Sequence, residues 1–203
     1  NYNDDEKDGY HTLVVYHNSR KEKSKTKVLA TQDIPERIEQ ICSFNNKYSH
    51  ETNKPRSIGE NGVAELSSEV PKELFETKRR LNLERGHPNV IDIVSVTNII
   101  QVGIDIQRLG VIEVIGQPRT SAEFIQATSR VGRGDYPGLV VVNYIASNPR
   151  DRSHYEQFKG YIKSVDRYVE PTSVTPAAEP SLKRTIQTCL VILAKHILGL
   201  SDQ

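Results

Sequence analysis

The stretch that decides the fold covers residues 111–144 and reads "VIEVIGQPRTSAEFIQATSRVGRGDYPGLVVVNY". It opens and closes with short apolar runs rich in β-branched residues, which are typical of buried strands. Between these runs, Thr120 and Glu123 have the spacing of a capping box, which marks the start of a helix. Strand, helix and strand in this order predict parallel strands of one sheet.

The same alternation extends toward the N-terminus. "HTLVVY" (residues 11–16) and "IDIVSVT" (residues 91–97) are two further candidate strands. The isoleucines between residues 34 and 41 share one helix face, and "PKELFETKRRL" (residues 71–81) begins with a proline suited to a first helical turn. A further strand is expected near "PRSIG" (residues 55–59). The sequence therefore predicts an α/β fold with a mainly parallel sheet, covered by helices on both faces.

After the last predicted strand, apolar residues recur at alternating spacings of three and four, which predicts a helix facing the core. They are Tyr155, Phe158, Ile162, Val165 and Val169. An aromatic ladder that stacks bases is the functional alternative. A proline-bearing connector then leads to "SLKRTIQTCLVILAKHILGL" (residues 181–200), an apolar helix that we expect to pack on another part of a parent protein. We expect a main domain over residues 1–170 and a linker with a C-terminal helix over residues 171–203.

Composition excludes several classes of protein. Of the 203 residues, 36% are apolar and 26% charged, which is typical of a globular domain, and the net charge of +1 favours no class of partner. Cys42 and Cys189 are too few for a disulfide framework, so we expect two reduced thiols in a cytoplasmic protein. No apolar run is long enough for a membrane span. The chain has no methionine and begins with the polar "NYNDDEKDG", so we expect a piece cut from a longer protein.

The usual signs of a complete nucleotide-hydrolysing site are missing from the printed sequence. It contains no Gly-Lys pair and hence no G-x-x-x-x-G-K-[ST] phosphate loop. "DEKD" (residues 5–8) spells an acidic helicase box by its letters, but it lies in a polar leader rather than at the end of a strand. No cysteine and histidine cluster suggests a metal site, so we expect no metal ligand in this chain.

Two linked motifs carry the remaining chemistry. "TNIIQVGID" (residues 97–105) directly follows a predicted strand, and "QATSRVGR" (residues 126–133) ends a predicted helix. Together they resemble motifs V and VI of the second RecA-like lobe of superfamily 2 helicases, which read T-x-x-x-x-x-G-x-D and Q-x-x-G-R-x-x-R. "LVVYHNSR" (residues 13–20) occupies the place of motif IV. The resemblance covers residues from about 11 to 144.

Two positions depart from the family patterns. Ser129 stands where the second pattern has glycine, and Val102 stands where some branches carry an arginine. Beyond the common motifs, "GQPRTSAEFIQATSRVGRG", "RDRSHYEQF" and "VEPTSVTP" are similar to the large helicase-like proteins of bacterial DISARM-type anti-phage systems.

The resemblance implies a RecA-like three-layer domain with a helical C-terminal extension. It also implies ATP as cofactor, with Mg²⁺ held mainly by an N-terminal lobe of the same protein. Arg130 and Arg133 would be catalytic arginine fingers, because a planar guanidinium suits the charge that develops on a transferred phosphate. Gly103, Asp105 and Gln126 would contact the nucleotide. From their spacing we expect both arginines on one face of a helix, near the carboxyl ends of the strands.

Each of these residues also has a purely structural interpretation. The arginines could form ordinary ion pairs with carboxylates such as Asp105, Asp105 could be a turn residue, and Gln126 could be a polar residue of a helix surface. The intact motif around them favours the functional interpretation.

Nucleic acid is the second implied partner, with DNA favoured over RNA because the narrower resemblance is to a DNA-defence system. Thr97, Asn98, Asn18 and Ser19 would contact the sugar-phosphate backbone, which sets register without reading bases. The basic run "RKEKSKTK" (residues 20–27) is expected to be a solvated loop, with a role in tracking the strand as the alternative.

The sequence as a whole predicts the C-terminal motor lobe of an ATP-dependent helicase or translocase. Because a phosphate loop and an acidic box are both lacking, the chain alone should be inactive. The competing interpretation is a catalytically inactive RecA-like module that binds nucleic acid or serves as a scaffold.

Overall fold

The computed structural model describes residues 8–48, 54–66, 71–97, 105–170 and 179–197. The chain forms two compact units, Asn1–Val169 and Glu170–Gln203. The second unit contains helix α9 (Glu179–His196), whose apolar side chains, among them Leu182, Ile186 and Leu190, are exposed. Within the described residues, no helix has both the length and the apolar composition needed to cross a bilayer.

The first unit is built on one sheet of five parallel strands, counted over the described residues, in the order β2-β3-β1-β4-β5. Their bounds are β1 (Leu13–His17), β2 (Val63–Leu66), β3 (Ile93–Val96), β4 (Val111–Ile115) and β5 (Leu139–Asn143). The predicted parallel α/β sheet is therefore confirmed, and four strands lie where the apolar runs predicted them. The further strand expected near residues 55–59 is present as β2 but lies later in the chain: residues 54–59 have no regular structure, and β2 begins at Val63.

Helices and short 3-10 turns connect the strands. Their bounds are α2 (Arg20–Thr31), α3 (Asp33–Tyr48), η1 (Glu60–Gly62), α4 (Pro71–Leu81), α6 (Ser121–Thr128), α7 (Pro149–Glu156), α8 (Phe158–Lys163) and η2 (Val165–Tyr168). α4 begins at the predicted proline. The predicted capping box of α6 is present, because the Thr120 hydroxyl accepts from the backbone NH of Glu123 and the Glu123 carboxylate accepts from the backbone NH of Thr120.

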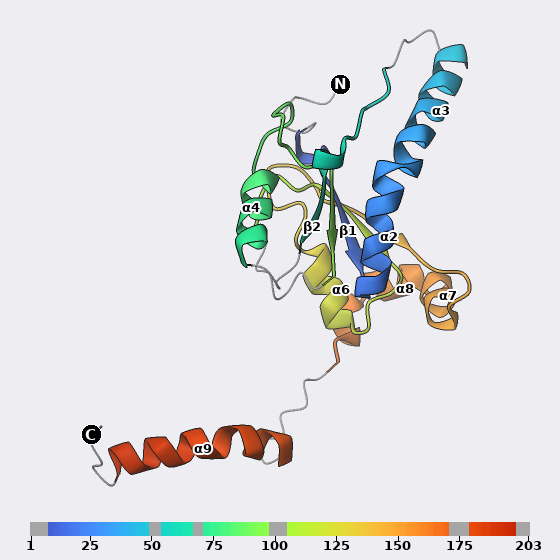
Figure 1. Cartoon of the computed structure of the whole chain (residues 1–203). Helices are drawn as coiled ribbons and strands as arrows, with labels where there is room; N and C mark the ends of the chain where they lie inside the picture. The colour runs from blue at the N-terminus through green and yellow to red at the C-terminus, as the bar shows by residue number, and fades with distance from the viewer. Residues whose placement is uncertain (1–7, 49–53, 67–70, 98–104, 171–178, 198–203) are drawn as a thin grey trace. The chain divides into compact units, whose positions relative to one another are not determined.

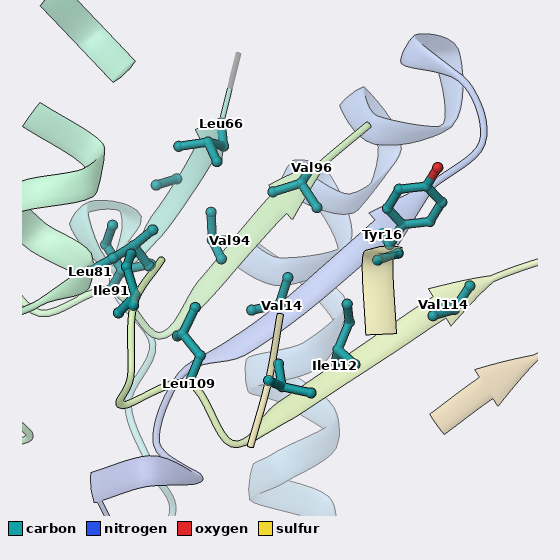
Figure 2. Close-up of a cluster of buried hydrophobic side chains, with 14 residues drawn as sticks. Val14, Tyr16, Leu66, Leu81, Ile91, Val94, Val96, Leu109, Ile112 and Val114 are labelled. Atoms are coloured by element: carbon teal, nitrogen blue, oxygen red, sulfur yellow. The ribbon is translucent and has the colours of Figure 1, made fainter. Parts of the chain in front are cut away.

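The sheet is covered on both faces, which gives the predicted three layers. Alternate strand residues such as Val14, Val94 and Ile112 face α4 and α6 and form the larger buried cluster (Figure 2). The residues between them, including Val15, face Ala30 of α2 on the other side. Figure 1 shows α2 and α4 on opposite sides of the strands. Period-two alternation in short strands thus fills two hydrophobic clusters, one on each face.

Because all strands run the same way, the sheet has two distinct ends. Asp92 and Gly110 precede their strands at what we call the amino end, whereas Asn18 and Thr97 follow their strands at the carboxyl end. At each end, backbone hydrogen bonds join the segments that flank neighbouring strands, as when Gly116 N donates to Asn143 O at the carboxyl end. This distinction decides where the motif residues can meet.

The basic run at residues 20–27 is not a loop. It forms the first two turns of α2, and Lys25 and Lys27 are exposed on that helix. The apolar residues that follow the run explain the difference, because Ala30 is fully buried against the sheet. Packing of the second half of α2 on the sheet therefore stabilises helical structure through the charged run as well, because helix formation is cooperative.

The predicted core-facing helix after β5 is also wrong. The segment breaks at Gln157 and Ser164 into α7, α8 and η2. As a result Tyr155 is 70% exposed, whereas Tyr161, which lies outside the predicted stripe, is 4% exposed. The Tyr161 ring packs edge-on against Phe124 of α6, with ring centroids 5.8 Å apart. A tertiary contact with α6 therefore overrides the helical period.

Candidate functional site

Arg133 and Asp105 form an ion pair at the amino end of the sheet. Arg133 Nη1 donates to Asp105 Oδ1 at 2.8 Å, and its Nε donates to the backbone carbonyl of Ser129 at 2.8 Å. The side chains are 33% and 74% exposed. An ion pair this open to solvent contributes only about 0–1 kcal/mol to folding. The pair therefore holds a charged guanidinium at the surface rather than stabilising the core.

Gly132 determines where Arg133 lies. It has a φ of 70°, in the left-handed region, and a Cβ built there would lie 2.3 Å from the backbone nitrogen of Gly138. Its NH donates to Leu109 O at 2.8 Å, which ties the turn to the residues just before β4. α6 starts near the carboxyl end of the sheet, and this turn completes the return of the chain to the amino end.

The expected position of the two arginines is therefore wrong on two counts. α6 ends at Thr128, so Arg130 lies in the turn after the helix and Arg133 lies beyond Gly132, not on one helix face. Both belong to the amino end of the sheet, not to the carboxyl rim where parallel sheets commonly bind ligands. Arg130 is half-buried and Gln126 is exposed near the end of α6.

The proposed nucleic-acid residues lie at the opposite end. Thr97 directly follows β3 and is half-buried, and Ser19 follows β1 and is exposed. Asn18 Nδ2 donates to the carbonyls of Ile115 at 3.1 Å and Gln117 at 3.2 Å. Its amide nitrogen is thus directed at the chain that follows β4. The structure brings motif IV and the start of motif V together and separates them from Arg133. Gly103 and Asn98 lie outside the described residues.

Arg108 is a residue that the sequence analysis missed. Its guanidinium donates to the Asp8 carboxylate, with Nε to Oδ2 at 2.9 Å, and to Thr12 Oγ1 and Leu81 O at 3.0 Å each. Burial alone would raise the pKa of Asp8, but hydrogen bonds from Arg108 and from the backbone NH of Arg85 outweigh it and lower the pKa. The sequence did contain a signal for this network, because the last aspartate of "DEKD" is Asp8, the ion-pair partner of Arg108 at the amino end.

A cleft of about 380 Å³ opens beside this network. It is lined by Asp8, Asn82, Glu84, Asp105, Gln107 and Arg108. Asp105 therefore shares this cleft with the Arg108 network, and its carboxylate is exposed beside Arg133. Within the described residues, no group of three histidine, cysteine or acidic side chains is arranged to hold a metal ion.

Residues 6–135 match the family described as "Helicase conserved C-terminal domain". The chain belongs to this helicase family. It is 39% identical over 189 residues to the DISARM protein DrmA of Bacillus paralicheniformis (strain ATCC 9945a / NCIMB 11709 / CD-2), which covers 93% of this chain and 16% of DrmA. The predicted resemblance to a superfamily 2 helicase lobe, and to DISARM proteins in particular, is confirmed.

Two solved structures share the fold of this helicase domain. The DUF1998 helicase MrfA bound to DNA and AMPPNP aligns with a TM-score of 0.60 at 20% identity, covering 96% of this chain and 24% of MrfA. MrfA bound to DNA aligns with a TM-score of 0.55 at 20% identity, covering 89% of this chain and 20% of that chain. The chain thus spans about a quarter or less of the relatives that it matches.

Proposed function

We propose that this helicase domain is the second motor lobe of an ATP-driven DNA helicase or translocase that acts in anti-phage defence. One observation carries the proposal: a solvent-facing Arg133–Asp105 pair stands at one end of the sheet, and Thr97 and Asn18 stand at the other. A motor lobe needs two separate surfaces, one for the nucleotide and one for the track. Coupling between them then runs through the lobe itself.

In this proposal Arg130 and Arg133 act across a cleft on a nucleotide held by an N-terminal lobe of the same protein. That lobe would supply the phosphate loop and the Mg²⁺ ligands. Asp105 would accept hydrogen bonds from the ribose hydroxyls and would pair with Arg133 between cycles of ATP hydrolysis. Gly103 and Gln126 would contact the nucleotide. ATP bound with Mg²⁺ supplies the phosphoanhydride bond, and the two guanidinium groups stabilise negative charge as that bond breaks.

The DNA track is proposed to lie along the carboxyl end, with contacts from Thr97, Asn98, Asn18 and Ser19. Support comes from MrfA, which was solved bound to DNA and to AMPPNP. The competing function is a scaffold that has lost catalysis. The exposed Arg133–Asp105 ion pair argues against loss, since a pair this open to solvent contributes little to folding.

The isolated 203-residue chain is expected to fold but to show no ATP turnover and at most weak nucleotide affinity. It contains no Gly-Lys pair and therefore no phosphate cradle of the usual kind. Phosphate release by the purified chain, compared with the full-length protein, is the measurement. Turnover by the isolated chain that Arg133→Ala abolishes would mean that a complete site exists in these residues, and the two-lobe proposal would be wrong.

Thr97→Ala in the full-length protein is expected to weaken single-strand binding by roughly tenfold to a hundredfold, the scale of one hydrogen bond to a charged group. Sequence preference should not change, because a phosphate contact carries no base information. Binding to oligonucleotides of different sequence measures both effects. Thr31→Ala is the matched control, because that hydroxyl donates to the helix carbonyl of Lys27 at the far end of α2. Equal losses of affinity in the two variants would show that Thr97 does not contact the nucleic-acid strand.

A further inference from the structure

The loop that follows β4, residues 116–119, is held by side chains from distant parts of the chain. Gly116 opens it with a φ of 71°, and a Cβ at this position would lie 3.1 Å from both Asn18 Nδ2 and Asp151 Oδ2. Asn18 donates to carbonyls on both sides of Gly116. The turn is therefore enclosed by two polar side chains and leaves little room for backbone movement.

Asp151 ties this loop to the end of β5. Its carboxylate accepts from the backbone NH of Gln117 at 3.2 Å and of Ile145 at 2.8 Å, and the residue is 2% exposed. Burying a carboxylate is costly unless hydrogen bonds replace its water shell. Both oxygens have such a bond, one to each strand end. Asp151 therefore joins the exits of β4 and β5 into one rigid surface.

Arg150, the neighbour of Asp151 in α7, binds the other side of the same loop. Its guanidinium donates to the carbonyls of Gln117 at 3.4 Å, Pro118 at 2.6 Å and Arg119 at 2.7 Å. Three successive carbonyls thus point at one planar cation. With Asn18 and Asp151 included, side chains satisfy the backbone polar groups along most of the loop.

The side chain of Gln117 is also fixed, and it points into the protein. Its Nε2 donates to the Tyr161 hydroxyl at 3.2 Å, and its Oε1 accepts from the Tyr144 hydroxyl at 3.3 Å. Tyr161 in turn donates to Ser121 Oγ at 3.3 Å. The loop's remaining polar side chain is Arg119, which is exposed and has no carboxylate partner among the described residues.

Arg119 stands on the same end of the sheet as Thr97 and Asn18. Thr97 and Asn18 directly follow the adjacent strands β3 and β1, and Arg119 lies on the loop that follows β4, the strand on the other side of β1. Residues distributed along one end of a sheet in this way suit an extended, charged backbone. A guanidinium is the side chain best matched to a phosphate, because it presents a planar fork of donors.

We propose that Arg119 binds a backbone phosphate of the nucleic-acid strand and that Arg150 and Asp151 are positioning residues that hold its loop in the binding geometry. The family match ends at residue 135, so both positioning residues lie outside the matched range. A loop held in advance loses less conformational entropy when it binds. This inference rests on the proposed function, because it assumes that nucleic acid lies along the carboxyl end.

The test uses the full-length protein and a labelled single-stranded oligonucleotide, with affinity measured over a series of salt concentrations. Arg119→Gln is expected to weaken binding by roughly tenfold. It should also reduce the slope of log affinity against log salt by about 0.7, the value for one phosphate contact on a single strand. Arg152→Gln is the matched control: it removes the same charge from α7, where Arg152 pairs with Glu156 in solvent.

A double-mutant comparison tests the positioning residues. Arg150→Gln alone should weaken binding by a few-fold, but it should add nothing in the Arg119→Gln background, because it acts only through Arg119. A general structural defect would instead weaken both backgrounds equally. Asp151→Asn should behave like Arg150→Gln. If the Asp151 variant unfolds, the Arg119→Gln variant still tests the proposal, because Arg119 is exposed and its replacement should not affect folding.

Two results would overturn the inference. Unchanged affinity and salt slope in Arg119→Gln would show that Arg119 does not contact a phosphate. Additive losses in the double variant would show that Arg150 does not act through Arg119. Either result, obtained while Arg133→Ala still abolishes turnover, would leave the motor-lobe proposal intact. If the wild-type protein bound no nucleic acid and Arg133→Ala left turnover unchanged, the proposed function itself would be wrong.

Discussion

Replacing Arg133 with alanine in the full-length protein is expected to reduce ATP turnover by about 10³-fold or more, the scale of a lost arginine finger. ATP binding should stay nearly intact, because the phosphate loop and the base contacts are proposed to lie on the other lobe. Arg133→Lys should restore little activity, since an ammonium keeps the charge but loses the planar fork. Single-turnover hydrolysis and equilibrium nucleotide binding separate the two effects.

Because the Arg133–Asp105 pair is exposed, an effect of the substitution on turnover can be distinguished from an effect on stability. With Asp105 74% exposed, losing the pair should change the free energy of unfolding by no more than about 1 kcal/mol. Arg152→Ala, which removes another exposed ion pair, serves as the control and should leave turnover unchanged. A lower melting temperature with normal turnover per folded molecule would make Arg133 an ordinary surface ion-pair residue, and the proposed motor would lose its main support.

Gly132→Ala is expected to destabilise the lobe by about 2–5 kcal/mol, because an L residue in the left-handed region costs about 1–2 kcal/mol and a clash with packed backbone about 1–3 kcal/mol. The added Cβ would lie 2.3 Å from Gly138 N, and no side-chain rotation can relieve a backbone contact. In molecules that do fold, the turn should shift Arg133, so turnover per folded molecule should fall as well. Urea unfolding and single-turnover hydrolysis measure the two effects.

Gly160→Ala is the matched control for this substitution. Gly160 lies within α8, and a Cβ there would meet nothing within 4 Å. Because alanine loses less chain entropy than glycine in a helix, the change should be neutral or stabilising by up to about 1 kcal/mol. Similar losses in the two variants would show that the Gly132 turn is not the constraint that we infer from its φ and its contacts.

The parts of the fold that were predicted correctly depend on residues close together in sequence. β4 has the bounds of its apolar run, α4 begins at Pro71, and the capping box of Thr120 and Glu123 forms as its spacing indicated. The failures share the opposite property. Residues 20–27 are helical because Ala30 is buried on the sheet, and Tyr161 faces inward because Phe124 of α6 lies against it. No local pattern contains either contact.

The candidate site divides in the same way. By itself, the sequence indicated Asp105, Arg130 and Arg133 as candidate site residues, since they belong to motifs defined by spacing along the chain. Only the tertiary structure decided that Arg133 reaches the amino end of the sheet while Thr97 stays at the carboxyl end. The physical reason is that α6 crosses the face of the sheet and Gly132 then turns the chain onto Leu109. Strand order and crossover direction result from packing between distant segments, so the separation of the two ends exists only in the folded chain.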